Sequence, residues 1–318
     1  MNERLVNYIE SSFLKEMLGD ENITDISYNG EFLFYQHNKL GRMKSDIVIT
    51  PEEASDFLRQ IANISEKQFS YTQPILDVSV YKYRINGVHQ SLVRVNNEKR
   101  VSFSIRIASL SNRIKGDNKF FTKEAKEIVF KYLDAHKSIV ISGPTGSGKT
   151  ELQKYLLESL SDNSRIIIID NIQELEFIRN NQNLDITTWQ VNEKIIEGSF
   201  SELIRNALRN NPDWLVVAES RGKEMNEVFS SVLTGHPIIT TMHSEDVLSI
   251  PHRIAKMVEM SDSTQPFNDI IEDVLKHIPC YIFLNHKIDK KGGVKRYIES
   301  IAISENNKLK IVYRSKDE

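Results

Sequence analysis

Ser138-Ile-Val-Ile-Ser-Gly143-Pro-Thr-Gly146-Ser-Gly148-Lys149-Thr150 is the stretch that decides the fold of this 318-residue chain. Its apolar start is typical of a buried strand, and apolar residues at helical spacing follow from Leu152 to Leu160. The pattern G-x-x-x-x-G-K-T between a strand and a helix predicts a phosphate-binding loop. The glycines let successive backbone N–H groups turn inward around a phosphate, and the N-terminus of the following helix points at the same place.

This loop predicts a nucleotide ligand. Lys149 would place its charge on the β- and γ-phosphates, and the Thr150 hydroxyl would bind Mg²⁺. A guanine-binding N-K-x-D motif would indicate GTP, but Asn285-His286-Lys287-Ile288-Asp289 is one residue too long for it. ATP with Mg²⁺ is therefore expected. The predicted nucleotide-binding residues are Gly143, Pro144, Thr145, Gly146, Ser147, Gly148, Lys149 and Thr150.

Three further apolar runs end in polar side chains that could serve the same site. Glu174 follows an isoleucine-rich run, Glu219 follows Trp-Leu-Val-Val-Ala, and His243 follows Ile-Ile-Thr-Thr-Met. The carboxyl ends of parallel strands meet at one edge of a sheet, and ligands bind there. A carboxylate at that edge could activate a water molecule or interact with Mg²⁺ and its bound waters. Simpler explanations stay open, because Glu174 could cap a turn and His243 could be structural.

Together these segments resemble the secretion ATPase superfamily, which comprises type II secretion, type IV pilus and type IV secretion motors. The matching boxes are G-P-T-G-S-G-K-T, I-D-N-I-Q-E, L-R-x-x-P-D with a later R-G-x-E, T-G-H-P and T-x-H-S. They run in family order over about residues 138 to 260. Tyr83-Arg84-Ile-Asn and Ser104-Ile-Arg106 extend the likeness toward the N-terminus.

The resemblance implies a role for each matching residue. Glu174 matches the catalytic glutamate, and Glu219 matches the Walker B glutamate that reaches Mg²⁺ through water. His243 matches the residue that senses the γ-phosphate. The arginines expected to complete the site are Arg84 and Arg106 of the N-terminal domain and Arg209 and Arg221 of the Walker B region.

The chain also departs from the family pattern. Asn171 stands where an aspartate is usual, and Asn211 stands where a second arginine is common. The single cysteine, Cys280, excludes the four-cysteine zinc insertion of many pilus-assembly and type II motors. The resemblance is therefore closest to the type IV secretion and conjugation branch. The alternatives are a type IV pilus or type II motor, a nucleic-acid-translocating RecA-like motor, and an ATP-dependent scaffold that does not hydrolyse ATP.

The expected fold class is α/β, with two domains. We predict a smaller α+β domain over residues 1–110, a linker over residues 111–121, and a RecA-like P-loop domain with a mostly parallel sheet over residues 122–318. The resemblance further implies a homohexamer that couples ATP hydrolysis to substrate translocation or to pilus or channel assembly. Its partners would be inner-membrane components of a secretion complex.

The N-terminal part reads mostly as short strands. Apolar residues at helical spacing predict one helix over residues 3–18. Thr50 and Pro51, followed by two glutamates, predict the start of a second helix. The predicted strands are residues 23–28, 32–37, 76–85 and 101–107.

Composition limits the partners and the location. The formal net charge is −3, so nothing in the overall charge favours a nucleic-acid partner. The start of the chain lacks the basic and apolar regions of a signal peptide, and no apolar run reaches the roughly 18 residues that a membrane-spanning helix needs. We therefore expect a cytoplasmic protein without a transmembrane segment, attached to the membrane through protein partners.

Overall fold

The computed structural model describes residues 2–109, 111–171, 175, 183–192, 195–261, 265–288 and 293–316. The chain divides into two compact units. The N-terminal unit is Met1–Leu110 with Lys287–Lys295, and the C-terminal unit is Ser111–His286 with Arg296–Glu318.

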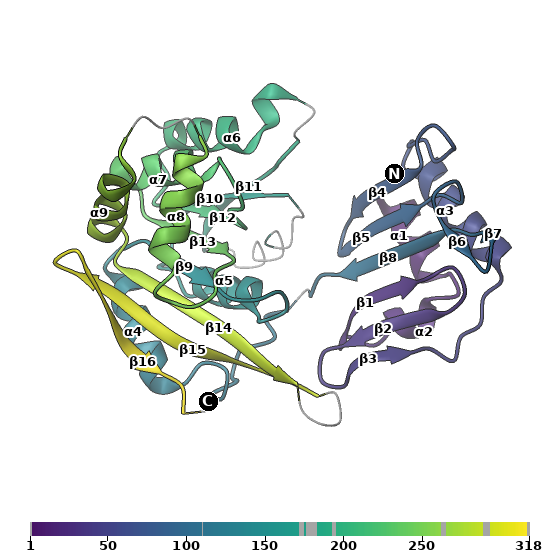
Figure 1. Ribbon diagram of the computed structural model, residues 1–318, viewed down its shortest axis with the longest axis horizontal. Helices are drawn as coiled ribbons and strands as arrows, with labels where there is room; N and C mark the ends of the chain where they lie inside the picture. Colours follow the sequence, from purple (N-terminus) through teal and green to yellow (C-terminus); the bar gives the residue numbers. More distant parts are fainter. Residues whose placement is uncertain are drawn as a thin grey trace. The chain divides into compact units, whose positions relative to one another are not determined.

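The N-terminal unit is an antiparallel sheet with its core on one face. Among the described residues the sheet has six strands in the order β3-β2-β1-β8-β5-β4. The apolar faces of α1 and α3 pack against it (Figure 1). The elements are α1 (Asn2–Glu10), α2 (Lys15–Leu18), β1 (Ile23–Tyr28), β2 (Leu33–His37), β3 (Gly41–Lys44), α3 (Pro51–Ile64), β4 (Ile75–Val80), β5 (Tyr83–Val88), β6 (Arg94–Val95), β7 (Glu98–Lys99) and β8 (Ser102–Ile107).

Local sequence signals explain several of these elements. The strand β1 has the predicted bounds, and β4 alternates buried and exposed residues as one covered face requires. Helix α3 starts at a capping box, as Thr50 and Pro51 predicted. Thr50 Oγ1 accepts from the Glu53 N–H at 3.1 Å, and the Glu53 carboxylate accepts from the Thr50 N–H at 2.7 Å.

Two predictions for this unit were wrong in detail. The expected helix over 3–18 is broken into α1 and α2, because the Ser12 hydroxyl donates to Ile9 O at 2.7 Å and accepts from the Leu14 N–H at 3.2 Å. The expected strand over 76–85 is the hairpin β4–β5, which turns at Tyr81 with φ 51°. Such turns favour Asn or Gly, so nothing in the sequence marked this one.

The C-terminal unit is built around a larger sheet. Its described elements are α4 (Lys123–Asp134), β9 (Ile139–Ser142), α5 (Lys149–Glu158), β10 (Arg165–Asp170), β11 (Asp185–Gln190), η2 (Ile196–Gly198), α6 (Phe200–Ala207), η3 (Leu208–Asn210), β12 (Trp214–Val217), α7 (Met225–Leu233), β13 (Ile238–Met242), α8 (Ile250–Glu259), α9 (Phe267–His277), β14 (Cys280–Ile288), β15 (Val294–Glu305) and β16 (Lys308–Arg314).

This sheet is mostly parallel and is covered on both faces. Over the described residues it has eight strands in the order β11-β10-β12-β13-β9-β14-β15-β16, and the five pairings from β11 to β14 are parallel. Helices α4 and α5 cover one face and α6 to α9 cover the other. The isoleucine run of β10 is divided accordingly, since Ile166 and Ile168 pack with the first group and Ile167 and Ile169 with the second. The predicted α/β class with a mostly parallel sheet is confirmed.

Two features of this unit help to position the candidate site. The segment predicted as a linker carries Ile114, Phe120 and Phe121, whose side chains are buried in the core that α4 and α5 share. The strand β9, which leads into the predicted phosphate-binding loop, lies between β13 and β14, while β12 borders β13. Because β12, β13 and β9 are parallel, whatever follows them meets at one edge of the sheet.

Candidate active site

The carboxyl ends of β12, β13 and β9 place three predicted residues together. Glu219 lies just after β12, His243 directly after β13, and Gly143 directly after β9. The backbone keeps these ends in register, because the Ser220 N–H donates to Thr241 O at 2.9 Å. Thr241 Oγ1 also donates to Ala218 O at 2.7 Å, which ties the end of β13 to the residue before Glu219.

The loop after β9 has the backbone that its glycines permit. Gly143, Gly146 and Gly148 have φ of 148°, 78° and 98°, in the region that side chains disfavour. At Gly143 there is also no space, because a Cβ atom would lie 2.3 Å from Leu284 O of β14. At Gly146, by contrast, a Cβ atom would meet nothing within 4 Å. The base of the loop is therefore tightly packed and its tip is open.

Lys149 lies in the first turn of α5 and folds back over the loop. Its Nζ donates to Gly143 O at 2.9 Å and to Pro144 O at 3.0 Å. Burial lowers the pKa of Lys149 to about 8. The charge of Arg221 lowers this pKa further, whereas the Glu219 carboxylate raises it. The ammonium group is thus held by neutral carbonyls in a partly desolvated place, where a polyphosphate would be a stronger partner.

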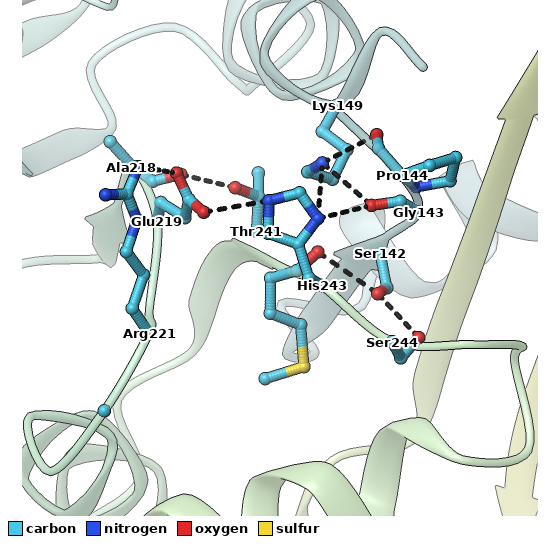
Figure 2. Close-up of polar contacts among 12 residues, drawn as sticks. Ser142, Gly143, Pro144, Lys149, Ala218, Glu219, Arg221, Thr241, His243 and Ser244 are labelled. Carbon is cyan, nitrogen blue, oxygen red and sulfur yellow. Dashed lines mark hydrogen bonds and ion pairs between the residues drawn. The ribbon is translucent and has the colours of Figure 1, made fainter. Parts of the chain in front are cut away.

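His243 lies between the loop and Glu219 (Figure 2). Its Nδ1 is 2.9 Å from Gly143 O and its Nε2 is 3.3 Å from Glu219 Oε1. A carbonyl oxygen only accepts, so the short contact requires a proton on Nδ1. The 3.5 Å separation between Nδ1 and Lys149 Nζ is correspondingly long. The imidazole therefore links the backbone of the phosphate-binding loop to a carboxylate of the neighbouring strand.

Glu219 is an ionised acid held by Arg221. Arg221 Nη2 donates to Glu219 Oε2 at 2.7 Å. Burial would raise the pKa of Glu219, but the Arg221 hydrogen bond and charge, with His243 and Lys149, outweigh it and hold this pKa below its usual range. The turn that presents Arg221 is fixed by Glu224, whose Oε1 accepts from the N–H groups of Arg221 and Gly222 at 2.6 and 2.8 Å. An ionised Glu219 can accept hydrogen bonds from water.

The other predicted arginines lie elsewhere. Arg84 of β5 and Arg106 of β8 are directly paired across the N-terminal sheet. Each is close to an acid on the neighbouring strand, since Arg84 Nη2 lies 3.5 Å from Asp77 Oδ2 and Arg106 Nε lies 3.3 Å from Asp25 Oδ1. The two guanidinium groups thus lie on the face of that sheet opposite α1 and α3, with their charges partly compensated. Their role at the nucleotide stays a prediction.

Of the remaining predicted residues, Arg209 lies away from the loop. Arg209 lies in the exposed turn η3, before β12, and the adjacent Asn210 O accepts from Arg165 Nε at 2.7 Å. Since Arg165 begins β10, Arg209 is at the amino edge of the sheet, whereas the phosphate-binding loop is at the carboxyl edge. Glu174 lies outside the described residues.

One contact of the loop was missed by the sequence analysis. Arg296 of β15 donates from Nε to Gly146 O at 2.6 Å. The first turn of α5 also holds the preceding segment, because Glu151 Oε2 accepts from the Arg113 N–H at 2.8 Å and Glu151 Oε1 from Lys154 Nζ at 3.2 Å. Arg296 and Gly146, like Arg113 and Glu151, are far apart in the chain and belong to no short motif, so no local signal could have found these two contacts.

The residues present fit a polyphosphate with Mg²⁺. The fully buried Ser147 Oγ has no hydrogen-bond partner within the described part of the chain, which leaves a polar atom to be satisfied at the loop. The described residues contain no cluster of three His, Cys, Asp or Glu side chains for a metal. Mg²⁺ would be held by the phosphates and the Thr150 hydroxyl, with Glu219 reaching it through water, and would neutralise phosphate charge.

Comparison with known families agrees with this geometry. The family model described as type II/IV secretion system protein matches residues 83–289. The chain belongs to the type II/IV secretion system protein family. The match includes the phosphate-binding loop, both described strand ends that carry Glu219 and His243, and the strands that carry Arg84 and Arg106.

Individual members of the family show how far the likeness extends. An uncharacterised protein of Bacillus anthracis is 29% identical over 261 residues, which span 80% of this chain and 57% of that protein. The conjugal transfer protein TrbB of Rhizobium radiobacter is 23% identical over 94% of this chain and 90% of its own length. The structure of the Legionella pneumophila ATPase DotB covers 96% of this chain and 80% of DotB, with 18% identity and a TM-score of 0.67, and shows the same fold.

Lys149 should make nucleotide affinity depend on pH. The lowered pKa of about 8 means that the free protein loses this proton as pH rises through 8, whereas bound phosphate would retain it. We expect ADP affinity, measured by isothermal titration calorimetry, to fall by up to about tenfold per pH unit above that pKa. Lys149→Arg stays protonated and should give a flat profile over pH 7.5 to 9.5 (about two units). Equal slopes in both proteins would contradict the assignment.

The same shift has a consequence for stability. The ordinary lysine pKa is 10.5, so between about 8 and 10.5 the unfolded chain binds more protons at this residue than the folded one. The contribution of Lys149 to the free energy of unfolding of the nucleotide-free protein therefore rises with pH across that window.

Proposed function

We propose that this protein is an ATPase that acts as a homohexameric ring and couples ATP hydrolysis to substrate translocation or channel assembly in a type IV secretion or conjugation apparatus. The observation that carries the proposal is the continuous polar chain from Lys149 through the Gly143 carbonyl and His243 to Glu219. It joins the phosphate-binding loop to the ends of β12 and β13. Gain or loss of a terminal phosphate would change the partners of all three elements at once.

The chemistry follows from the charges at this edge. Lys149 would leave its two carbonyl partners for the β- and γ-phosphates, which releases the Gly143 carbonyl from one of its donors. His243 would exchange its own bond to the Gly143 carbonyl for one to the γ-phosphate when that phosphate is present. Glu219, kept ionised by Arg221, would orient the water shell of Mg²⁺, and Glu174 would accept the proton of the attacking water.

Support for the type IV branch comes from one relative and from the composition of the chain. The similarity to TrbB, a conjugal transfer protein, extends over nearly all of both chains. The chain has one cysteine, which cannot form a four-cysteine zinc site. These features favour a conjugation or secretion motor over a zinc-containing pilus motor.

Attachment to a membrane would come through partners. No helix in the described ranges combines the length and the apolar character that crossing a bilayer requires. The apolar faces of α1 and α3 are buried in the N-terminal core, so the first helix does not present an apolar surface of its own to lipid. We propose inner-membrane components of the secretion apparatus as the attachment.

The ATPase assignment is tested by turnover of the purified protein with and without Mg²⁺. Lys149→Ala should abolish hydrolysis but leave the protein folded, because the ammonium group contacts loop carbonyls and is held there at a cost in desolvation. Lys123→Ala, at an exposed position of α4, is the matched control. Wild-type turnover in Lys149→Ala would refute the assignment.

Substitution of Glu174 and of Glu219 should change ATP turnover in two different ways. If Glu174 is the base, Glu174→Gln should keep ATP binding and slow turnover by roughly 10²–10⁴, because glutamine cannot accept a proton. Glu219→Gln should raise the Mg²⁺ concentration that is needed for half-maximal turnover. ATP binding without metal should change much less. The reverse pattern, with Glu174→Gln near normal and Glu219→Gln slow at every Mg²⁺ concentration, would show that the two roles are exchanged.

The proposed role of Arg84 and Arg106 at the nucleotide is tested against the structural alternative that each only pairs with an acid on the N-terminal sheet. Arginines that reach a γ-phosphate contribute about 10³–10⁵ in rate in P-loop enzymes, whereas a paired arginine on an open sheet face contributes almost nothing to turnover. Arg84→Ala and Arg106→Ala should therefore bind ATP and hydrolyse it far more slowly. Arg59→Ala, on the exposed side of α3, serves as control. Losses below about tenfold in both variants would favour the structural alternative.

The ring is tested by light scattering after size exclusion. We expect a hexamer, stabilised by ATP in the slowly hydrolysing Glu174→Gln protein, since a ligand that binds only the assembled form favours it by mass action. A monomer at every protein and nucleotide concentration would exclude the ring while leaving the ATPase assignment intact.

A further inference from the structure

The tip of the phosphate-binding loop is held from outside the loop by β15. Arg296, a half-buried residue of that strand, donates from Nε to Gly146 O at 2.6 Å. We infer that Arg296 is a positioning residue that fixes the Gly146–Ser147 peptide in the orientation that binds a nucleoside polyphosphate. The inference rests on the proposed function and adds to it a residue outside the family motifs.

The tip needs such support because little else holds it. Thr145 and Gly146 are exposed, and a Cβ atom at Gly146 would meet nothing within 4 Å. The base of the loop is fixed differently, by the close approach of Gly143 to Leu284 O and by Lys149. Within the loop, the Ser147 N–H makes a long turn bond to Pro144 O at 3.3 Å. An exposed glycine with few contacts would otherwise sample many conformations.

The geometry of one peptide plane connects Arg296 to the ligand. The carbonyl of Gly146 and the N–H of Ser147 belong to the same trans peptide group, so they point in opposite directions. When Arg296 holds the carbonyl, the N–H is held on the other side, where the turn of the loop lies. Its present bond of 3.3 Å is weak and easily exchanged for a phosphate oxygen.

Charge strengthens the same arrangement. A guanidinium group stays protonated, and a cation on the carbonyl oxygen polarises the peptide and makes its N–H a better donor. Burial lowers the pKa of Arg296, Arg113 lowers it further, and the Glu151 carboxylate opposes both. Glu151 is in the first turn of α5, so the network that surrounds Arg296 begins on the helix that follows the loop.

The arrangement predicts a loss of binding without a comparable loss of chemistry. In Arg296→Gln, the dissociation constant for ADP and the KM for ATP should rise by about ten- to a hundredfold, the effect of one charge-assisted hydrogen bond. The kcat at saturating ATP should stay within about threefold, since bound nucleotide itself holds the loop. Arg296→Lys keeps the charge but lacks the fixed Nε–H, so its KM should rise by about threefold.

The experiment compares wild type, Arg296→Gln, Arg296→Lys and the control Arg253→Gln, an exposed arginine of α8. ADP affinity is measured by calorimetry, ATP turnover by phosphate release, and melting temperature without nucleotide. Unchanged KM and ADP affinity in both Arg296 variants would overturn the inference, as would a fall in kcat at constant KM. If Arg296→Gln does not fold, a wild-type KM in Arg296→Lys overturns it. Failure of the wild-type protein to bind ADP would instead refute the proposed function.

Discussion

Gly143 is the position on which the candidate site depends, because its backbone passes so close to β14 that no side chain fits. A Cβ atom there would lie 2.3 Å from Leu284 O and 2.8 Å from Ser147 Oγ. The close approach fixes the direction of the Gly143 carbonyl, which accepts from both Lys149 Nζ and His243 Nδ1 at 2.9 Å. Through these two donors, one backbone oxygen sets the resting positions of Lys149 and of the histidine that contacts Glu219.

Two cations are partly desolvated at the loop. Lys149 Nζ is held by the Gly143 and Pro144 carbonyls, and Arg296 Nε by the Gly146 carbonyl. Burial lowers the pKa values of Lys149 and Arg296, so both cations are held at a cost in the free protein. A polyanion near both cations would offset that cost, and for Lys149 it would replace neutral carbonyl partners with charged ones. This difference would contribute to the affinity for phosphate.

Features that depend on neighbouring residues could be predicted, and features that depend on distant ones could not. The capping box at Thr50 and the loop from Gly143 to Thr150 are local patterns with a physical cause, and the parallel sheet then brought Glu219 and His243 together. The turn at Tyr81 was hidden because the residue adopts a positive φ without the usual Gly or Asn. The contact of Arg296 with Gly146 joins residues 150 positions apart, so it appears only once β15 is placed.

The place of β9 in the sheet has a consequence for the order in which the protein forms. Ser142, the last residue of β9, donates to Met242 O, 100 residues later in the chain, and pairs with Phe283 on its other side. Long-range pairings of this kind form late, because a long loop must close, with a loss of chain entropy, before the pairing can stabilise the fold. A growing chain on the ribosome would expose the phosphate-binding motif long before the strands that support it arrive. A nucleotide could then be bound only after β13 and β14 have joined β9.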